Sequence, residues 1–266
     1  MRSASRPTTT DVVVPIISGL YGLLFGSFLN VVIHRVPLGQ SVTKPRSRCP
    51  QCESELAWHD NVPVLSWLVL RGSCRTCAEP ISARYPLVEL ITAVGFVAVS
   101  LSVGANWVLP SYLMFVAVLV ALSGIDIDTR TIPNKLLYPA GFAGAALLVG
   151  GSLLDGSAED LIWAAAGAAL GFAVLFAIWF VAPGGMGYGD VRLSAYLGMY
   201  LGYQSLGHVA VGIFIGFLLG ALSGIALMVV GGRGRKSKLP FGPFLALGAM
   251  TSLLAGQVII DAYLGI

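Results

Sequence analysis

The feature that most constrains the fold is a series of long apolar stretches separated by short polar loops. A helix that crosses a bilayer needs about 17–25 such residues. Eight candidates lie near residues 12–33, 87–103, 108–125, 136–154, 161–182, 191–203, 207–230 and 241–264. Only 11% of the 266 residues are charged, against about 25% in soluble domains. We therefore predict an all-α polytopic membrane protein with about eight transmembrane helices, of which 191–203 is the shortest.

The basic residues are confined to alternate loops, which indicates the orientation of the chain. Fourteen of the 16 fall in loops 34–86, 126–135, 183–192 and 231–240. By the positive-inside rule these loops face the cytoplasm. Arg2 and Arg6 depart mildly from the rule, because they would lie on the opposite side with the N-terminus. A cluster in the last loop is expected to set topology and to contact anionic lipid; it comprises Arg233, Arg235, Lys236 and Lys238.

All four cysteines fall in the first basic loop, as two CxxC pairs separated by 21 residues. They are Cys49, Cys52, Cys74 and Cys77. This spacing is typical of a tetrahedral four-thiolate zinc site, which has no open position and is structural. A reducing cytoplasm argues against disulfides, although a redox dithiol pair is the alternative. A loop of this size needs a metal to supplement its small core.

These patterns predict three domains. Residues 1–34 form the first transmembrane helix, and residues 35–86 form a small cytoplasmic zinc-knuckle domain. Residues 87–266 form a seven-helix membrane domain. A search for chemistry in that last domain begins with its acids, because carboxylates at membrane helices are costly and are usually functional.

Three acids stand at the ends of apolar stretches. Asp126 and Asp128 close the third stretch, and Asp190 follows the glycine-rich segment that contains Gly187 and Gly189. The glycines allow unusual backbone conformations and a close approach of another chain. Two carboxylates that share a proton can activate a water and polarise a peptide carbonyl. This arrangement predicts aspartyl proteolysis at a membrane surface.

Three other interpretations are open at this point. The acids could cap helices or pair with Arg130 and Arg192. A proton-coupled transporter could use Asp126 and Asp190 as carriers, although transporters often have repeated halves and this chain has no convincing repeat. A membrane scaffold could present its zinc domain to a partner, and it would then tolerate loss of both aspartates.

The ordered motifs resemble those of type IV prepilin peptidases, membrane aspartyl proteases of the GxGD type. The resemblance covers nearly the whole chain and is specific as a set. It rests on FGSFLNVVIHRVP at 25–37, the two CxxC pairs with NVPVLSW and LRG between them, ISARYP at 81–86 with Glu89, DID and IPN between 126 and 134, GMGYGDV at 185–191, and PFGPF at 240–244.

The resemblance implies a function. Such enzymes, in the cytoplasmic membrane of prokaryotes, cut the short basic leader from prepilins or pseudopilins of pili and secretion systems. Many then N-methylate the new N-terminus with S-adenosylmethionine. The catalytic aspartates of the family map onto Asp126 and Asp190, with Asp128 as the alternative for the first position. Asp128, Gly187, Gly189 and Glu89 are expected as supporting or substrate residues. The expected partners are these substrates and membrane lipid, and not nucleic acid.

Several details complete the expectations. Arg192 stands where the family has Lys, and Asn134 where many relatives have Asp; neither change removes a catalytic carboxylate. Glu89 lies just inside the second span and needs a partner, for which Arg35, Arg84 or the aspartate site are candidates. The chain lacks the glycine-rich fingerprint of soluble methyltransferases, so the site for S-adenosylmethionine is expected near the cysteine loop, with no ligands named.

Overall fold

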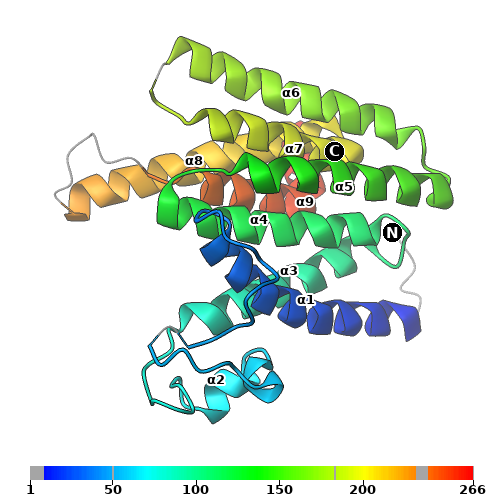
Figure 1. Cartoon of the computed structure of the whole chain (residues 1–266). Helices are drawn as coiled ribbons and strands as arrows, with labels where there is room; N and C mark the ends of the chain where they lie inside the picture. The colour runs from blue at the N-terminus through cyan, green and yellow to red at the C-terminus, as the bar shows by residue number, and fades with distance from the viewer. Residues whose placement is uncertain (1–8, 50, 183, 232–238, 266) are drawn as a thin grey trace. The chain divides into compact units, whose positions relative to one another are not determined.

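A computed structural model describes residues 9–49, 51–182, 184–231 and 239–265. In these ranges the chain is helical, and it contains isolated β-bridges but no strand (Figure 1). The helices are α1 (Thr9–Arg35), the 3-10 helix η1 (Trp58–Asn61), α2 (Leu65–Val69), α3 (Arg84–Val103), α4 (Leu109–Thr129), α5 (Asn134–Asp155), α6 (Asp160–Val181), α7 (Tyr188–Gln204), α8 (Leu206–Gly231) and α9 (Gly242–Leu264). Arg2, Arg6 and the basic cluster Arg233, Arg235, Lys236 and Lys238 lie outside the described residues.

Seven described helices are long and apolar enough to cross a membrane, namely α1, α3, α4, α5, α6, α8 and α9. The prediction of an all-α, multi-pass membrane protein is therefore confirmed. The expected eighth span at 191–203 forms α7, which has 17 residues and does not reach this standard. Ten residues of α7 are buried. A helix surrounded by protein does not need the apolar surface that lipid demands, which is why α7 is the more polar element.

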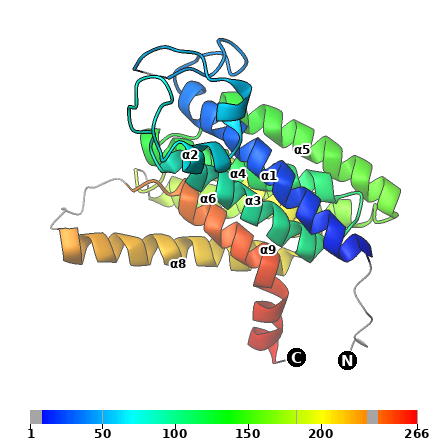
Figure 2. The same ribbon diagram turned by 90° about the horizontal axis from the view of Figure 1, so that it is seen from below.

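The chain divides into two compact units, Met1–Ala105 and Asn106–Ile266. In the first unit, α1 packs on α3, and glycine allows their backbones to meet. A Cβ at Gly22 would lie 2.6 Å from the Cα of Ala93, and one at Gly26 would lie 2.6 Å from the Cα of Glu89. Close packing through small residues is typical of membrane helices. The irregular cysteine loop with short α2 connects these two helices (Figure 2).

The second unit is a bundle in which α4 and α7 are the inner helices. The helix α4 contacts α5 and α9, while α7 contacts α6, α8 and α9. In α4, 61% of the apolar 18-residue segment is buried inside the protein, against 22% in α6 and 17% in α8. The helices α6 and α8 therefore present most of their surface outward, whereas α4 and α7 carry polar groups into the interior. The assignment of residues 1–34, 35–86 and 87–266 to separate domains stays a prediction.

Candidate active site and metal centre

Asp126 lies in the last turn of α4 and is only 4% exposed. The backbone N–H of Gly242, the first residue of α9, donates a hydrogen bond to its Oδ2 at 2.9 Å. Unpaired N–H groups and the positive end of the helix dipole favour a carboxylate at this place. A Cβ at residue 242 would also stand 2.9 Å from the same oxygen. The start of α9 thus both holds and confines the Asp126 carboxylate.

Asp190 is the third residue of α7 and is 7% exposed. Its carboxylate accepts a hydrogen bond from the backbone N–H of Gly187, the residue that caps the helix. A side chain that reaches back from the third helical position to the cap is a capping-box contact. A Cβ at Gly187 would lie 3.3 Å from Oδ2 of Asp190. The glycine-rich segment therefore fixes the direction of this acid.

The two acids come together at one end of the second unit. Close packing joins their elements, because a Cβ at Gly189 would lie 3.0 Å from the Cβ of Ile132 in the loop after α4. The carboxylates of Asp126 and Asp190 interact electrostatically. The end of α4 and the starts of α7 and α9 therefore build a single cluster from three segments that are distant in sequence.

Asp128 and the neighbouring arginines have other surroundings. Asp128 is exposed, two residues beyond Asp126. Arg192 hydrogen bonds to Asn134 and lies over the ring of Tyr188, 5.3 Å from its centroid. Neither Asp126 nor Asp190 forms an ion pair with another described residue, in contrast to Asp60, which pairs with Arg75 at 2.6 Å. Helix capping is one of the alternative roles that the sequence leaves open for these acids, and Asp190 does cap the N-terminus of α7.

The four cysteines form one cluster in the first unit. Their sulfur atoms all lie within 4.8 Å of one another, and Sγ of Cys49 and Cys77 are 3.7 Å apart. Four thiolates around one zinc, at Zn–S distances of about 2.3 Å, stand about 3.8 Å apart, whereas a disulfide is about 2.05 Å long. The hydrogen bond with Ser54 lowers the pKa of the Cys52 thiol to about 6. Cys52 thus offers the thiolate form that metals bind.

The two cysteine pairs have the same backbone geometry. In each pair the first cysteine donates its N–H to a carbonyl five residues later and accepts the N–H four residues later. These bonds are Cys49 to Ser54 at 3.0 Å, Glu53 to Cys49 at 3.0 Å, Cys74 to Glu79 at 2.8 Å, and Ala78 to Cys74 at 3.0 Å. Glu53 and Ala78 both adopt left-handed conformations, with φ of 55° and 59°. Two equivalent knuckles therefore present their thiols to a common centre.

Glu89 belongs to the first unit, where it holds the cysteine loop. It is 7% exposed, and its Oε2 accepts the N–H of Val64 at 2.7 Å. The Ser27 hydroxyl is a second partner. Arg35, one of the expected partners, instead donates to the carbonyls of Ser41 and Pro45 at 3.0 and 2.9 Å. The partner of this buried acid is therefore a backbone amide of the NVPVLSW segment.

Comparisons with known proteins assign this architecture to a family. The model of the bacterial peptidase A24 N-terminal domain matches residues 20–103, and that of the type IV leader peptidase family matches residues 113–229. The chain is 38% identical to a prepilin leader peptidase/N-methyltransferase of Aeromonas hydrophila, over 92% of each chain. The chain belongs to the type IV leader peptidase family.

Other relatives extend this result across bacteria. The chain is 36% identical to a protein of the same name from Bacillus subtilis, over 92% of this chain and 96% of the relative. It is 34% identical to one from Pseudomonas aeruginosa, over 92% and 91%. No solved structure matches the chain. The family models divide the chain near the boundary between its two compact units.

Sequence reasoning missed the part that Gly242 plays in this leader peptidase. The PFGPF motif contributed to the resemblance, but nothing in the sequence places its glycine beside Asp126. The available signal was the combination of glycine and proline at a helix start, which leaves a free N–H and room above it.

The two departures from the family pattern, Arg192 and Asn134, are hydrogen-bonded to each other.

Proposed function

We propose that this chain cleaves the leader peptide of type IV prepilins or pseudopilins and then N-methylates the new N-terminus. Asp126 and Asp190 are the proposed catalytic pair. The observation that carries the proposal is the meeting of two buried acids, with the charge of Asp126 acting on Asp190, in the bundle of a type IV leader peptidase. Buried carboxylates without an ion-pair partner are costly in a membrane protein, and a catalytic role accounts for their presence here.

The chemistry follows from placing two buried carboxylates at helix N-termini. Asp126 accepts the Gly242 N–H at the start of α9 and Asp190 accepts the Gly187 N–H at the start of α7, so a helix terminus favours a negative charge at each of them. One ionised carboxylate can take a proton from water while the other, protonated, donates to the peptide carbonyl. Because the proton is shared by a coupled pair, the roles belong to the pair rather than to one fixed residue.

The substrate of this chemistry is a peptide bond at a membrane boundary. The acids lie at the ends of α4 and α7, beside loops 126–135 and 183–192 that carry basic residues. The positive-inside rule places those loops in the cytoplasm. A prepilin has an apolar helix that can enter the bilayer and a cationic leader that stays in the cytoplasm. The proposed location is therefore the cytoplasmic membrane, with lipid and prepilins as partners and no nucleic acid.

Two further groups complete the proposal. Cys49, Cys52, Cys74 and Cys77 are the proposed ligands of a structural Zn²⁺, because four sulfur atoms gathered within 4.8 Å suit that ion and leave it no open position. S-Adenosylmethionine is the proposed methyl donor, because the relatives named above are also N-methyltransferases. It supplies an activated methyl group.

The transporter hypothesis loses its basis, since the family match and the named relatives concern leader peptidases. The scaffold hypothesis makes a different prediction from the peptidase, because a scaffold tolerates loss of both acids. The same experiment separates all three.

The test is cleavage of a prepilin in membranes by Asp126→Asn, Asp190→Asn and Asp128→Asn variants at matched protein levels. Loss of an acid–base group costs about 10²–10⁴-fold, so we expect the first two variants to lose cleavage to that extent. Asp128 is exposed, so Asp128→Asn should lose less cleavage than Asp126→Asn; the reverse order would make Asp128 the first acid of the pair. Cleavage that survives both Asp126→Asn and Asp190→Asn would refute the proposed pair.

A further inference from the structure

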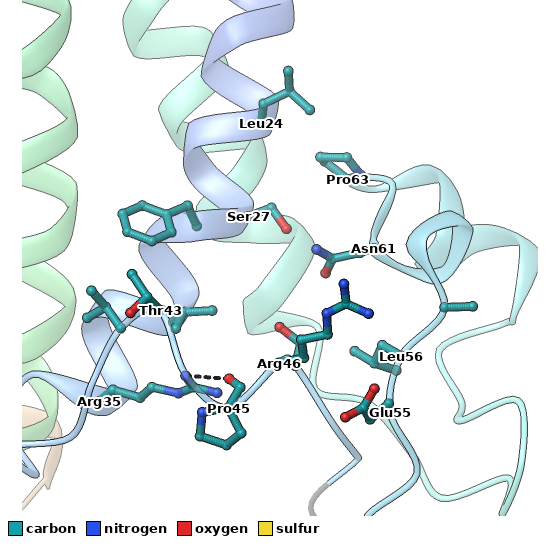
Figure 3. Close-up of a pocket in the computed structure, with 15 residues that line it drawn as sticks. Leu24, Ser27, Arg35, Thr43, Pro45, Arg46, Glu55, Leu56, Asn61 and Pro63 are labelled. Carbon is teal, nitrogen blue, oxygen red and sulfur yellow. Dashed lines mark hydrogen bonds between the residues drawn. The ribbon is translucent and has the colours of Figure 1, made fainter.

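The first unit contains a cavity of about 820 Å³ whose lining includes neither the two catalytic acids nor the four cysteines. One wall is a face of α1, and the other is the cysteine loop with Leu56 and Pro63 (Figure 3). The side chain of Arg46 lies between the two walls in this view. The volume is within the usual range of about 300–1,000 Å³ for small-molecule sites, so the cavity can hold a lipid headgroup with part of its chains.

We propose that this cavity binds one molecule of phosphatidylethanolamine from the membrane. Its phosphate lies at Arg35 and Arg46, its ammonium lies at Glu55, and one of its acyl chains follows α1. The inference goes beyond the proposed function, since it rests on α1 as a membrane-spanning helix and not on the peptidase or methyltransferase activity.

The α1 wall has the spacing and the length that a lipid chain requires. Its lining residues recur at intervals of four, three and four positions, which places them on one face of the helix; they are Leu24, Phe28, Val31 and Arg35. Leu24 and Phe28 are 58% and 46% exposed. From Leu24 to Arg35 the helix rises about 16 Å, which is about half of the hydrocarbon thickness of about 30 Å. An acyl chain of one leaflet can therefore run along this face with its headgroup at Arg35.

The polar end of the cavity carries two guanidinium groups and one carboxylate, from Arg35, Arg46 and Glu55. None of these three groups forms an ion pair with another described residue. Arg35 is held in place because its Nη1 donates to the carbonyls of Ser41 and Pro45 at 3.0 and 2.9 Å. A guanidinium has five N–H donors, so these two bonds leave donors for a phosphate, the group that arginine binds best. Glu55 would repel a headgroup that is only anionic, whereas it attracts the ammonium of phosphatidylethanolamine.

The part of the cysteine loop next to this cavity has the surface of a segment that contacts a membrane. Leu65, Leu68 and Val69 of α2 are 61%, 56% and 76% exposed, and Pro63, two residues before α2, lines the cavity. Contiguous exposed apolar side chains mark protein or membrane contacts. Since α1 is itself a membrane span, the bilayer is the apolar phase that both walls share. This favours a membrane lipid over a soluble phosphate compound as the ligand.

The test is native mass spectrometry of the purified full chain in detergent, titrated with lipids that have identical acyl chains. Phosphatidylglycerol lacks the ammonium, and the quaternary ammonium of phosphatidylcholine cannot donate a hydrogen bond to a carboxylate. A hydrogen bond to a charged group changes affinity by about tenfold or more, so we expect one retained phosphatidylethanolamine per chain and about tenfold weaker binding of the other two lipids. Equal retention of the three lipids would refute the proposal. Free phosphoethanolamine, the headgroup without chains, should not compete; if it displaces the lipid at similar concentration, the ligand is a soluble phosphate compound and the proposal is wrong.

Two pairs of variants locate the site in the same assay. Arg46→Gln should weaken phosphatidylethanolamine binding about tenfold. Arg48→Gln is its matched control, because Arg48 is also exposed in this loop but does not line the cavity. Glu55→Gln should abolish the preference for phosphatidylethanolamine over phosphatidylglycerol, whereas Glu53→Gln, exposed and outside the lining, should keep it.

An unchanged limited-proteolysis pattern of the cysteine loop shows that a variant is folded. If folded Arg46→Gln and Glu55→Gln both bind like the wild type, with the same lipid preference, the assigned cavity is wrong. A change of preference in Glu55→Gln supports the site even if Arg46→Gln does not fold. Because the assay involves neither prepilin nor catalysis, its failure leaves the proposed function untouched.

Discussion

The cysteine cluster and the aspartate pair are built in opposite ways. The cluster uses two short turns with the same backbone hydrogen bonds, and each turn brings its own two thiols together. The aspartate pair depends on three helix ends, where Gly242 touches Asp126 and Gly189 lies against Ile132. Each half of the cysteine cluster is specified by local sequence, and only the loop between the two turns must close to join them. The aspartate pair exists only when the bundle of α4, α7 and α9 has assembled. Perturbations should therefore act on the two sites independently.

The largest expected effect comes from breaking a knuckle. Cys74→Ser removes one of four zinc ligands, and a structural zinc contributes about 10–16 kcal/mol to the folding of small domains. We expect loss of zinc from the protein and rapid proteolysis of the loop between α1 and α3. Metal analysis and limited proteolysis measure this result. Prepilin cleavage should survive, because the aspartate site uses only residues of the second unit; loss of cleavage in a well-expressed variant would show that the two regions are coupled.

The next effect tests the long-range site. In Gly242→Ala the new Cβ would lie 2.9 Å from Oδ2 of Asp126, so the carboxylate must move. A displacement of about 1 Å can cost about 10²-fold in rate, and we expect a loss of that order in prepilin cleavage. Zinc content should not change. Gly150→Ala is the control within the same unit, since nothing lies within 4 Å of its added Cβ; equal cleavage by the two variants would contradict the assigned contact.

A smaller effect should follow from Glu89→Ala. This change leaves the Val64 N–H without its acceptor, at a cost of about 1–3 kcal/mol for a buried unsatisfied group. We expect weaker methyl transfer and little change in cleavage. Glu89→Gln keeps an acceptor oxygen and should restore most methyl transfer. The assay is labelled methyl incorporation into cleaved pilin, and failure of Glu89→Gln to rescue would argue that charge, rather than the hydrogen bond, is what matters.

The smallest effect concerns the coupled departures from the family pattern. Arg192 contacts Asn134 and Tyr188 on the outside of the aspartate site. Arg192→Lys should change prepilin cleavage only a few-fold, since lysine keeps the positive charge and a hydrogen-bond donor at this position. Kinetics of Arg192→Lys alone and together with Asn134→Asp measure the coupling. A restored rate in the double variant would show that the pair acts as a unit, and additive losses would show that it does not.

The sequence predicts features that depend on local residues better than features that depend on long-range contacts. The CxxC spacing predicts the cysteine cluster because each pair of ligands is local. The apolar stretches predict the helices, but α7 shows the limit, since burial by protein replaces the apolar surface that marks a span. The contact of Gly242 with Asp126 joins residues 116 positions apart, and no local pattern encodes it. The sequence predicts that Glu89 needs a partner, yet a backbone amide carries no side-chain signal that would identify it.

The shortness of α7 has a consequence for access of water to the acids. At about 1.5 Å per residue, its 17 residues span about 25 Å, less than the hydrocarbon thickness of about 30 Å. Because α7 is surrounded by other helices, this shortness imposes no mismatch with lipid, and the remaining depth can be filled by irregular backbone that lines a water-filled cavity. Asp190 lies in the first turn of this helix, directly after the glycine-rich segment. A short inner helix thereby lets a water molecule and a peptide bond reach the acids without any change in the thickness of the bilayer.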